Sequence, residues 1–185
     1  MAAYYFIAQL PSLDGIGENM MPPITEERFL ELCHRFLPPK ALRDLDRLTL
    51  LPPRVAEPSD SSLLNAWNEG ERDLRLALGK ARAEKLKKPF DTENRSFPPD
   101  LVKAVGAAIA SDSPLEAEKL LNQYRLAFLE SLRPMDNFSQ DFVYYYGLKL
   151  KLILRIRQFD ASIGEAAYRT IYSSIVNGDR VEAMA

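Results

Sequence analysis

The sequence has almost none of the residues that stabilise small secreted proteins or bind metals. Its 185 residues include one cysteine, Cys33, and one histidine, His34. A single cysteine cannot close a disulfide within the chain, which excludes the disulfide-rich secreted class and favours a cytoplasmic location. One His and one Cys also cannot supply the usual four ligands of a structural zinc site. We therefore expect no metal ion and no other cofactor.

Long apolar runs and an excess of one charge are missing as well. Nowhere do about 18 apolar residues follow one another without a charge, so no membrane-spanning helix is expected. Lys and Arg together number 24 and Asp and Glu 26, for a formal net charge of -2. Such a balance gives no overall field that would attract nucleic acid, and we expect no nucleic-acid partner.

Motifs for catalysis are also lacking. The chain has no G-x-x-x-x-G-K-[ST] sequence, which excludes a P-loop ATPase. Cys33 and His34 are adjacent, but successive residues on a helix do not face each other, so we expect Cys33 to be a buried hydrophobe rather than a nucleophile. The carboxylate pairs fit helix starts and solvated helix faces. We expect the chain not to be an enzyme and to have no small-molecule substrate.

The sequence does contain helical periodicity, interrupted by proline. Its thirteen prolines include four Pro-Pro pairs between segments whose apolar residues recur every three or four positions. Ser113, Pro114 and Glu116 form the clearest helix start, a capping box with proline at the first helical position. These patterns predict an all-α bundle of about seven helices. The expected helices begin near residues 25, 39, 61, 101, 113, 138 and 162.

Charged residues of the long helix that begins near residue 61 are expected to face solvent. Its periodicity places apolar residues inward and Glu71, Arg72 and Arg75 toward water. The cations between residues 80 and 88 suit the negative end of this helix, and we interpret them as a solvated face.

A polar stretch bounded by prolines, residues 89–99, is the clearest internal boundary of the chain. Few apolar residues lie in it, so we expect a loop there. We expect a single helical domain over residues 1–185, with two helical halves, 1–90 and 98–185, as the alternative.

The segment from Leu148 to Arg157 is ambiguous because apolar and basic residues nearly alternate in it, which is typical of a half-buried strand. The surrounding stretch, Phe138 to Phe159, contains no proline and only Gly147, and it is long for a strand. We therefore expect a helix. The alternative is a short β-ribbon between this segment and the apolar run from Tyr4 to Leu10.

Basic residues within this segment are the strongest candidates for a functional surface. Cations between leucines and isoleucines cannot all reach water on a packed helix, so some must pair with carboxylates inside the protein or on a partner. The preceding tyrosines are amphipathic residues of the kind enriched at interfaces. The candidate partner interface comprises Tyr144, Tyr145, Lys149, Lys151, Arg155 and Arg157.

The opening of the chain carries a family resemblance. Residues 4–13 have the sequence YYFIAQLPSL and are followed by Pro22-Pro23-Ile24 and Phe29-Leu30. This pattern resembles an uncharacterised bacterial family whose members are typically encoded among V/A-type ATPase subunits. The segments NEGERDLRLAL, residues 68–78, and YYGLKLKL, residues 145–152, are loosely similar to the helical pattern of the ATPase C subunit, called d in eukaryotes.

The resemblance implies a non-catalytic accessory or C-like coupling subunit of a V/A-type ATPase that translocates protons or sodium ions. Its partners would be other ATPase subunits, and it would lie in the cytoplasm or peripherally on the cytoplasmic face of the membrane. Two alternatives stay open: a helical adaptor that binds proteins of another pathway, and a small ligand-binding protein that uses an apolar pocket near residues 144–146.

Overall fold

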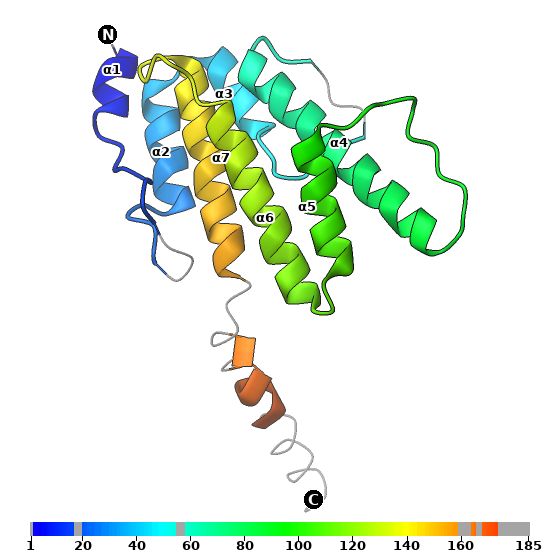
Figure 1. The fold of residues 1–185 in the computed structure, drawn as a ribbon. Coiled ribbons are helices and arrows are strands. Elements are labelled where there is room, and N and C mark those ends of the chain that lie inside the picture. Colours follow the sequence, from blue (N-terminus) through cyan, green and yellow to red (C-terminus); the bar gives the residue numbers. More distant parts are fainter. Residues whose placement is uncertain (1, 17–19, 55–57, 159–163, 166–167, 174–185) are drawn as a thin grey trace, which may run out of the picture.

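The computed structural model describes residues 2–16, 20–54, 58–158, 164–165 and 168–173 (Figure 1). The described residues contain helices and no strand, which confirms the all-α class. Beyond the labelled helices, residues 168–173 are also helical, whereas the expected helix start at Ser162 lies outside the described residues. The labelled helices are α1 Ala2–Ile7, α2 Glu26–Phe36, α3 Pro39–Asp46, α4 Ser62–Lys85, α5 Pro99–Ala110, α6 Pro114–Ser131 and α7 Gln140–Arg157.

Side-chain caps explain where the main helices begin. The Ser113 hydroxyl accepts a hydrogen bond from the backbone N–H of Glu116 at 3.4 Å, and Pro114 is the first residue of α6, as the capping box predicts. Thr25 caps α2 in the same way, and Ser139 caps α7. Each cap satisfies a backbone donor that the first helical turn leaves without an intrahelical partner.

Helix α7 is the central element of the bundle and lies between α2 and α6 in Figure 1. Every residue from Val143 to Leu150 is buried, so this helix is covered on all sides. A helix that is buried around its whole circumference has apolar residues on every side, whereas a surface helix has them on one side only. The near alternation of Leu and Lys in the sequence therefore arises from a fully packed helix.

The alternative of a short β-ribbon is wrong. Both of its proposed strands are helical: Tyr4 falls within α1, and Leu148 to Arg157 form the last part of α7. Helix α1 was not among the expected helices, because its apolar run is only a few residues long. It forms with Phe6 and Ile7 buried against the bundle, and Phe6 stacks on Phe36 of α2 at 5.8 Å between ring centroids.

The buried apolar residues form two clusters that share α4. The larger cluster surrounds α7 and includes residues of α1, α2, α3 and the first part of α4. The smaller one joins Leu74 and Leu78 of α4 to Leu101 of α5 and Leu121 of α6. The loop expected at residues 89–99 is present between α4 and α5, and α4 contacts both α5 and α7, so the helices before and after this loop pack together. The division of the chain into two halves stays a prediction.

Glu71 is not on a solvated face, contrary to the sequence analysis. Its carboxylate is 2% exposed and lies 2.7 Å from the Nε atom of Arg125, which is also buried. Asn122 accepts a further hydrogen bond from this guanidinium at 3.1 Å. The prediction failed because α4 is covered by other helices on more than one side, and the compensating cation comes from α6.

The composition of the helices bears on membrane insertion. Over the residues described, none of them combines the length and the apolar composition required to cross a bilayer. The longest, α4, has charged residues from Glu69 to its end at Lys85.

Candidate functional site

Lys149 of α7 is held inside the bundle by two carboxylates. Its Nζ atom lies 2.6 Å from Asp14 Oδ1 and 2.6 Å from Glu130 Oε1, and the residue is 8% exposed. Burial disfavours its positive charge, but hydrogen bonds to Asp14 and Glu130 outweigh this effect and raise the pKa of Lys149. In turn, the hydrogen bond from Lys149 lowers the pKa of Asp14. This cation therefore has its partners within its own chain.

Two further cations of α7 also have intramolecular partners. Lys151 forms a hydrogen-bonded ion pair with Glu26 at the start of α2. Arg155 donates from Nη2 to Glu118 Oε1 of α6 at 2.6 Å. The sequence analysis left open whether these cations pair with carboxylates of the protein or of a partner, and Lys149, Lys151 and Arg155 pair within the chain.

The remaining members of the candidate interface are buried or in contact with the chain itself. Tyr144 is fully buried, and Tyr145 is 3% exposed and donates from its hydroxyl to Glu130 Oε2 at 2.8 Å. Arg157 lies against the sulfur of Met21. All six residues lie on α7, within the bundle or at its margin, but they contact different neighbours: Lys151 contacts α2, and Arg155 contacts α6. Their role in binding a partner stays a prediction.

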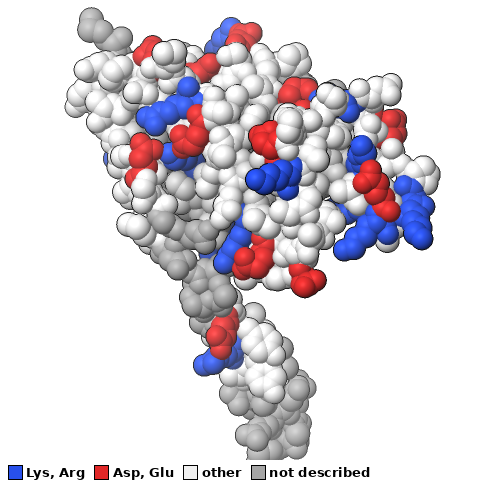
Figure 2. Space-filling view, in the orientation of Figure 1, with Lys and Arg blue, Asp and Glu red and all other residues white. Residues whose placement is uncertain are grey.

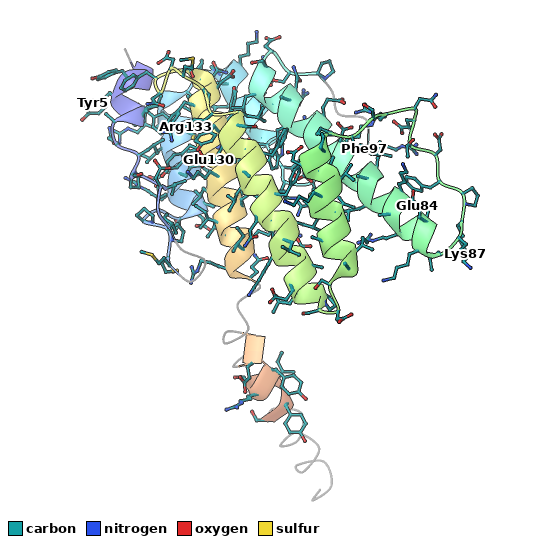
Figure 3. The ribbon with its side chains drawn as sticks, viewed as in Figure 1. Tyr5, Glu84, Lys87, Phe97, Glu130 and Arg133 are labelled. Atoms are coloured by element: carbon teal, nitrogen blue, oxygen red, sulfur yellow. The ribbon has the colours of Figure 1, made fainter. Side chains whose placement is uncertain are left out.

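A cavity of about 330 Å³ lies beside Tyr145, in the region where an apolar pocket was considered. One wall is formed by residues 7–8 and 10–14, between α1 and α2. Figure 3 shows Arg133 and Glu130 close together near the end of α6, on this side of the molecule. The cavity is lined on its other sides by Arg133, Asn137, Phe138, Phe142, Tyr145 and Lys149.

Exposed aromatic rings lie next to this cavity. Tyr4 of α1 stacks on Phe138, with 4.3 Å between ring centroids, although the two residues are 61% and 44% exposed. Tyr5 is 65% exposed, and Figure 3 shows it at the outer edge of the bundle. We call Tyr4, Tyr5 and Phe138 the aromatic surface. Within this surface the stacked rings of Tyr4 and Phe138 present an apolar face that is already ordered, whereas Tyr5 contacts Phe36.

A second cavity, of about 290 Å³, has a different character because three arginines line it. Arg72 and Arg75 come from successive turns of α4, and Arg54 comes from the segment before it. Glu93, in the loop after α4, accepts hydrogen bonds from Arg54 and Arg72. We call this the arginine cavity. The sequence analysis missed it: the spacing of Arg72 and Arg75 shows that they share a helix face, but nothing local indicates that Arg54 and Glu93 meet them there.

The lysines near the end of α4 form a separate basic surface. Figure 2 shows Lys and Arg side chains gathered at one end of the molecule, over the C-terminal part of α4. Lys85, Lys87 and Lys88 are exposed, and Glu84 lies among them, 3.9 Å from Lys80. Their arrangement is that of a solvated helix end with both charge signs present.

Cys33 and His34 do not form a catalytic pair. Cys33 is fully buried, and burial raises the pKa of its thiol to about 12, which keeps it protonated at neutral pH. His34, next to it on α2, is exposed. Across the part of the chain that the structure describes, no group of three or more His, Cys, Asp or Glu residues is arranged to hold a metal ion.

Comparisons with known proteins assign no family to this arrangement. The chain matches no family model, no curated protein and no solved structure. The indications of its function are the sequence resemblance and the contacts within the structure.

Proposed function

We propose that this chain is a non-catalytic accessory subunit of a V/A-type ATPase and acts by binding other subunits of that complex. The observation that carries the proposal is the resemblance of residues 4–13, with the proline and phenylalanine positions that follow, to a family encoded among such subunits. As such a subunit, it would lie on the cytoplasmic face of the membrane, held there by its partners.

The contacts made by the resembling segments support the proposal. The hydroxyl of Tyr146 donates to the backbone carbonyl of Pro11 at 2.8 Å, and Lys149 binds Asp14 just after the opening segment. The opening segment therefore packs against residues 145–152, one of the two segments that are loosely similar to the ATPase C subunit.

The aromatic surface includes Tyr4 and Tyr5, the exposed aromatic residues of the opening segment. Phe6 and Ile7 are buried, whereas Tyr4 and Tyr5 are more than half exposed. Aromatic residues contribute most of the binding energy in many protein interfaces, and the adjacent cavity of about 330 Å³ can accept an apolar side chain. We propose that an apolar segment of another ATPase subunit binds here.

Affinity purification tests the proposal. The tagged protein is isolated in low salt from gently solubilised cells, and the chains that accompany it are identified by mass spectrometry. Recovery of catalytic and rotor subunits in fixed proportion supports an ATPase subunit. Recovery of unrelated proteins would favour the adaptor alternative, and recovery of the protein alone would contradict both.

Two matched variants locate the interface. Tyr4→Ser with Tyr5→Ser removes exposed rings, so we expect loss of the partners with the helical circular dichroism retained. Leu86→Ser with Val102→Ser removes two exposed apolar residues elsewhere, which are 66% and 54% exposed, and should leave the partners bound. Equal loss in both variants would contradict the assignment of this surface.

A further inference from the structure

The arginine cavity has both a cationic and an apolar lining. Guanidinium groups of Arg54, Arg72 and Arg75 line it, with the single carboxylate of Glu93. Its volume of about 290 Å³ is at the lower end of the range for small-molecule sites. Such a combination is suited to a small molecule with one charged and one apolar part. The apolar lining is formed by Pro52, Pro53, Leu76 and Phe90.

Some guanidinium donors of the arginines that line this cavity have no hydrogen-bond partner. Glu93 accepts from Arg54 Nη2 at 3.1 Å and from Arg72 Nη2, and Arg75 Nη1 donates to the carbonyl of Pro52 at 2.6 Å. Two donors, Arg72 Nε and Arg75 Nη2, are buried without any hydrogen-bond partner. Buried donors on a charged group are costly to leave unbonded, so they indicate an acceptor that these arginines can share.

The charges around the cavity indicate the kind of acceptor. Three arginines face one carboxylate, which leaves a surplus of two positive charges among the lining residues. Arg95 does not line the cavity; it pairs with Glu69 and Asp73, and its Nε atom also lies 4.0 Å from Oε2 of Glu93. A phosphate monoester carries about -1.5 to -2 charges at pH 7 and three acceptor oxygens, whereas a carboxylate carries one charge and two oxygens.

We propose that the arginine cavity binds a small organic phosphate monoester. Its phosphate accepts hydrogen bonds from Arg72 and Arg75, and its apolar body lies against Leu76 and Phe90. The inference is independent of the proposed role in an ATPase, because the cavity contains none of the residues of the aromatic surface. Either can fail without the other.

Isothermal titration calorimetry with three probes tests the ligand class. Phenyl phosphate has both parts of the proposed ligand, benzoate keeps the ring with a carboxylate, and inorganic phosphate lacks the ring. We expect phenyl phosphate to bind about tenfold more tightly than either of the others, because only it satisfies the charge and covers the apolar wall. Absence of binding, or equal affinity for all three probes, would overturn the proposal.

Charge variants of the whole chain test the site. Arg75→Gln should weaken phenyl phosphate binding about tenfold or more, since it removes a charged donor. Arg82→Gln, an exposed position on the same helix, is the matched control and should leave the affinity unchanged. If both variants weaken binding equally, the ligand is held by general electrostatic attraction and the proposed site is wrong.

Glu93→Gln gives a result that loss of folding cannot imitate. Glu93 competes with the ligand for Arg54 and Arg72, so removal of its charge should tighten phenyl phosphate binding several-fold. Circular dichroism confirms that the variant remains folded. Weaker binding by a folded Glu93→Gln protein would contradict the proposal.

Discussion

At the scale of single residues, Glu71 and Arg125 form an ion pair in which both charges are buried. Both side chains are nearly inaccessible to water, with exposures of 2% and 7%. Removing two charges from water costs several kcal/mol, and only close, well-directed hydrogen bonds compensate this cost. The bond of 2.7 Å between Arg125 Nε and Glu71 Oε1, with Asn122 on a neighbouring nitrogen, meets that requirement.

We predict that Glu71→Leu lowers the free energy of unfolding by about 3–5 kcal/mol, because it leaves Arg125 buried without its main counter-charge. Adding Arg125→Met to that variant should restore most of the loss, since neither charge is then buried alone. Urea unfolding followed by circular dichroism measures both changes. Glu84→Gln, an exposed position on the same helix, should change stability by less than about 0.5 kcal/mol. A loss below about 1 kcal/mol for Glu71→Leu would contradict this view of the pair.

At the scale of elements, the starts of α2 to α7 could be predicted from the sequence, but α1 and the orientation of the helices could not. Ser113 and Thr25 cap their helices as expected because caps depend on residues within one turn. The burial of Glu71 depends on Arg125, 54 positions later, and no local pattern shows that contact. Likewise, the arginine cavity is formed by residues from two loops and α4. The arginines can be identified in the sequence, but their proximity in the fold cannot be predicted from it.

Gly70 of α4 allows the Phe128 ring of α6 to pack directly against the helix backbone. A Cβ atom added at Gly70 would lie 2.2 Å from Cε1 of Phe128. The Phe128 ring cannot easily move, because it is stacked between Trp67 and Tyr124 at centroid distances of 6.2 and 6.3 Å. Overlap of this size must displace a helix or a packed ring.

We therefore expect Gly70→Ala to destabilise the protein by about 1–3 kcal/mol, although alanine favours helices. Gly106→Ala in α5 is the matched control: nothing lies within 4 Å of its added Cβ, so we expect a gain of about 0.5–1 kcal/mol. Thermal unfolding of the two variants compares them directly. A rise in melting temperature for both would show that the Phe128 ring does not pack this closely on Gly70.

At the scale of the whole molecule, α7 links distant parts of the chain by charge. Its cations bind Asp14 and Glu26 near the start of the chain, and Glu118 and Glu130 on α6. Each of these pairs joins residues far apart in the sequence, so each one forms only when the bundle is assembled. The ion pairs therefore contribute to overall stability rather than to the formation of single helices.

Acid should weaken this linkage at Asp14. The hydrogen bond from Lys149 lowers the pKa of Asp14 in the folded protein. The contribution of Asp14 to the free energy of unfolding is therefore complete above the unfolded pKa of about 3.9, and it is lost as the pH falls through the lower folded pKa. We expect the protein to be more stable than Asp14→Asn at pH 7, and the difference to shrink below about pH 4. Urea unfolding at pH 7, 5 and 3 measures it. A difference that does not change with pH would contradict the assignment.

The cations of α7 also allow a direct choice between an internal and an external role. Lys151 and Arg155 bind Glu26 and Glu118, so Lys151→Glu with Arg155→Glu would place like charges together in partly buried surroundings. We expect the double variant to lose about 2–3 kcal/mol of stability, measured by urea unfolding. The control, Lys85→Glu with Lys88→Glu, makes the same charge change at exposed positions and should lose little. If the α7 variant keeps full stability but loses its protein partners, these cations form an interface. If it is destabilised as expected, the cations have an internal role, and the aromatic surface is then the candidate for partner binding.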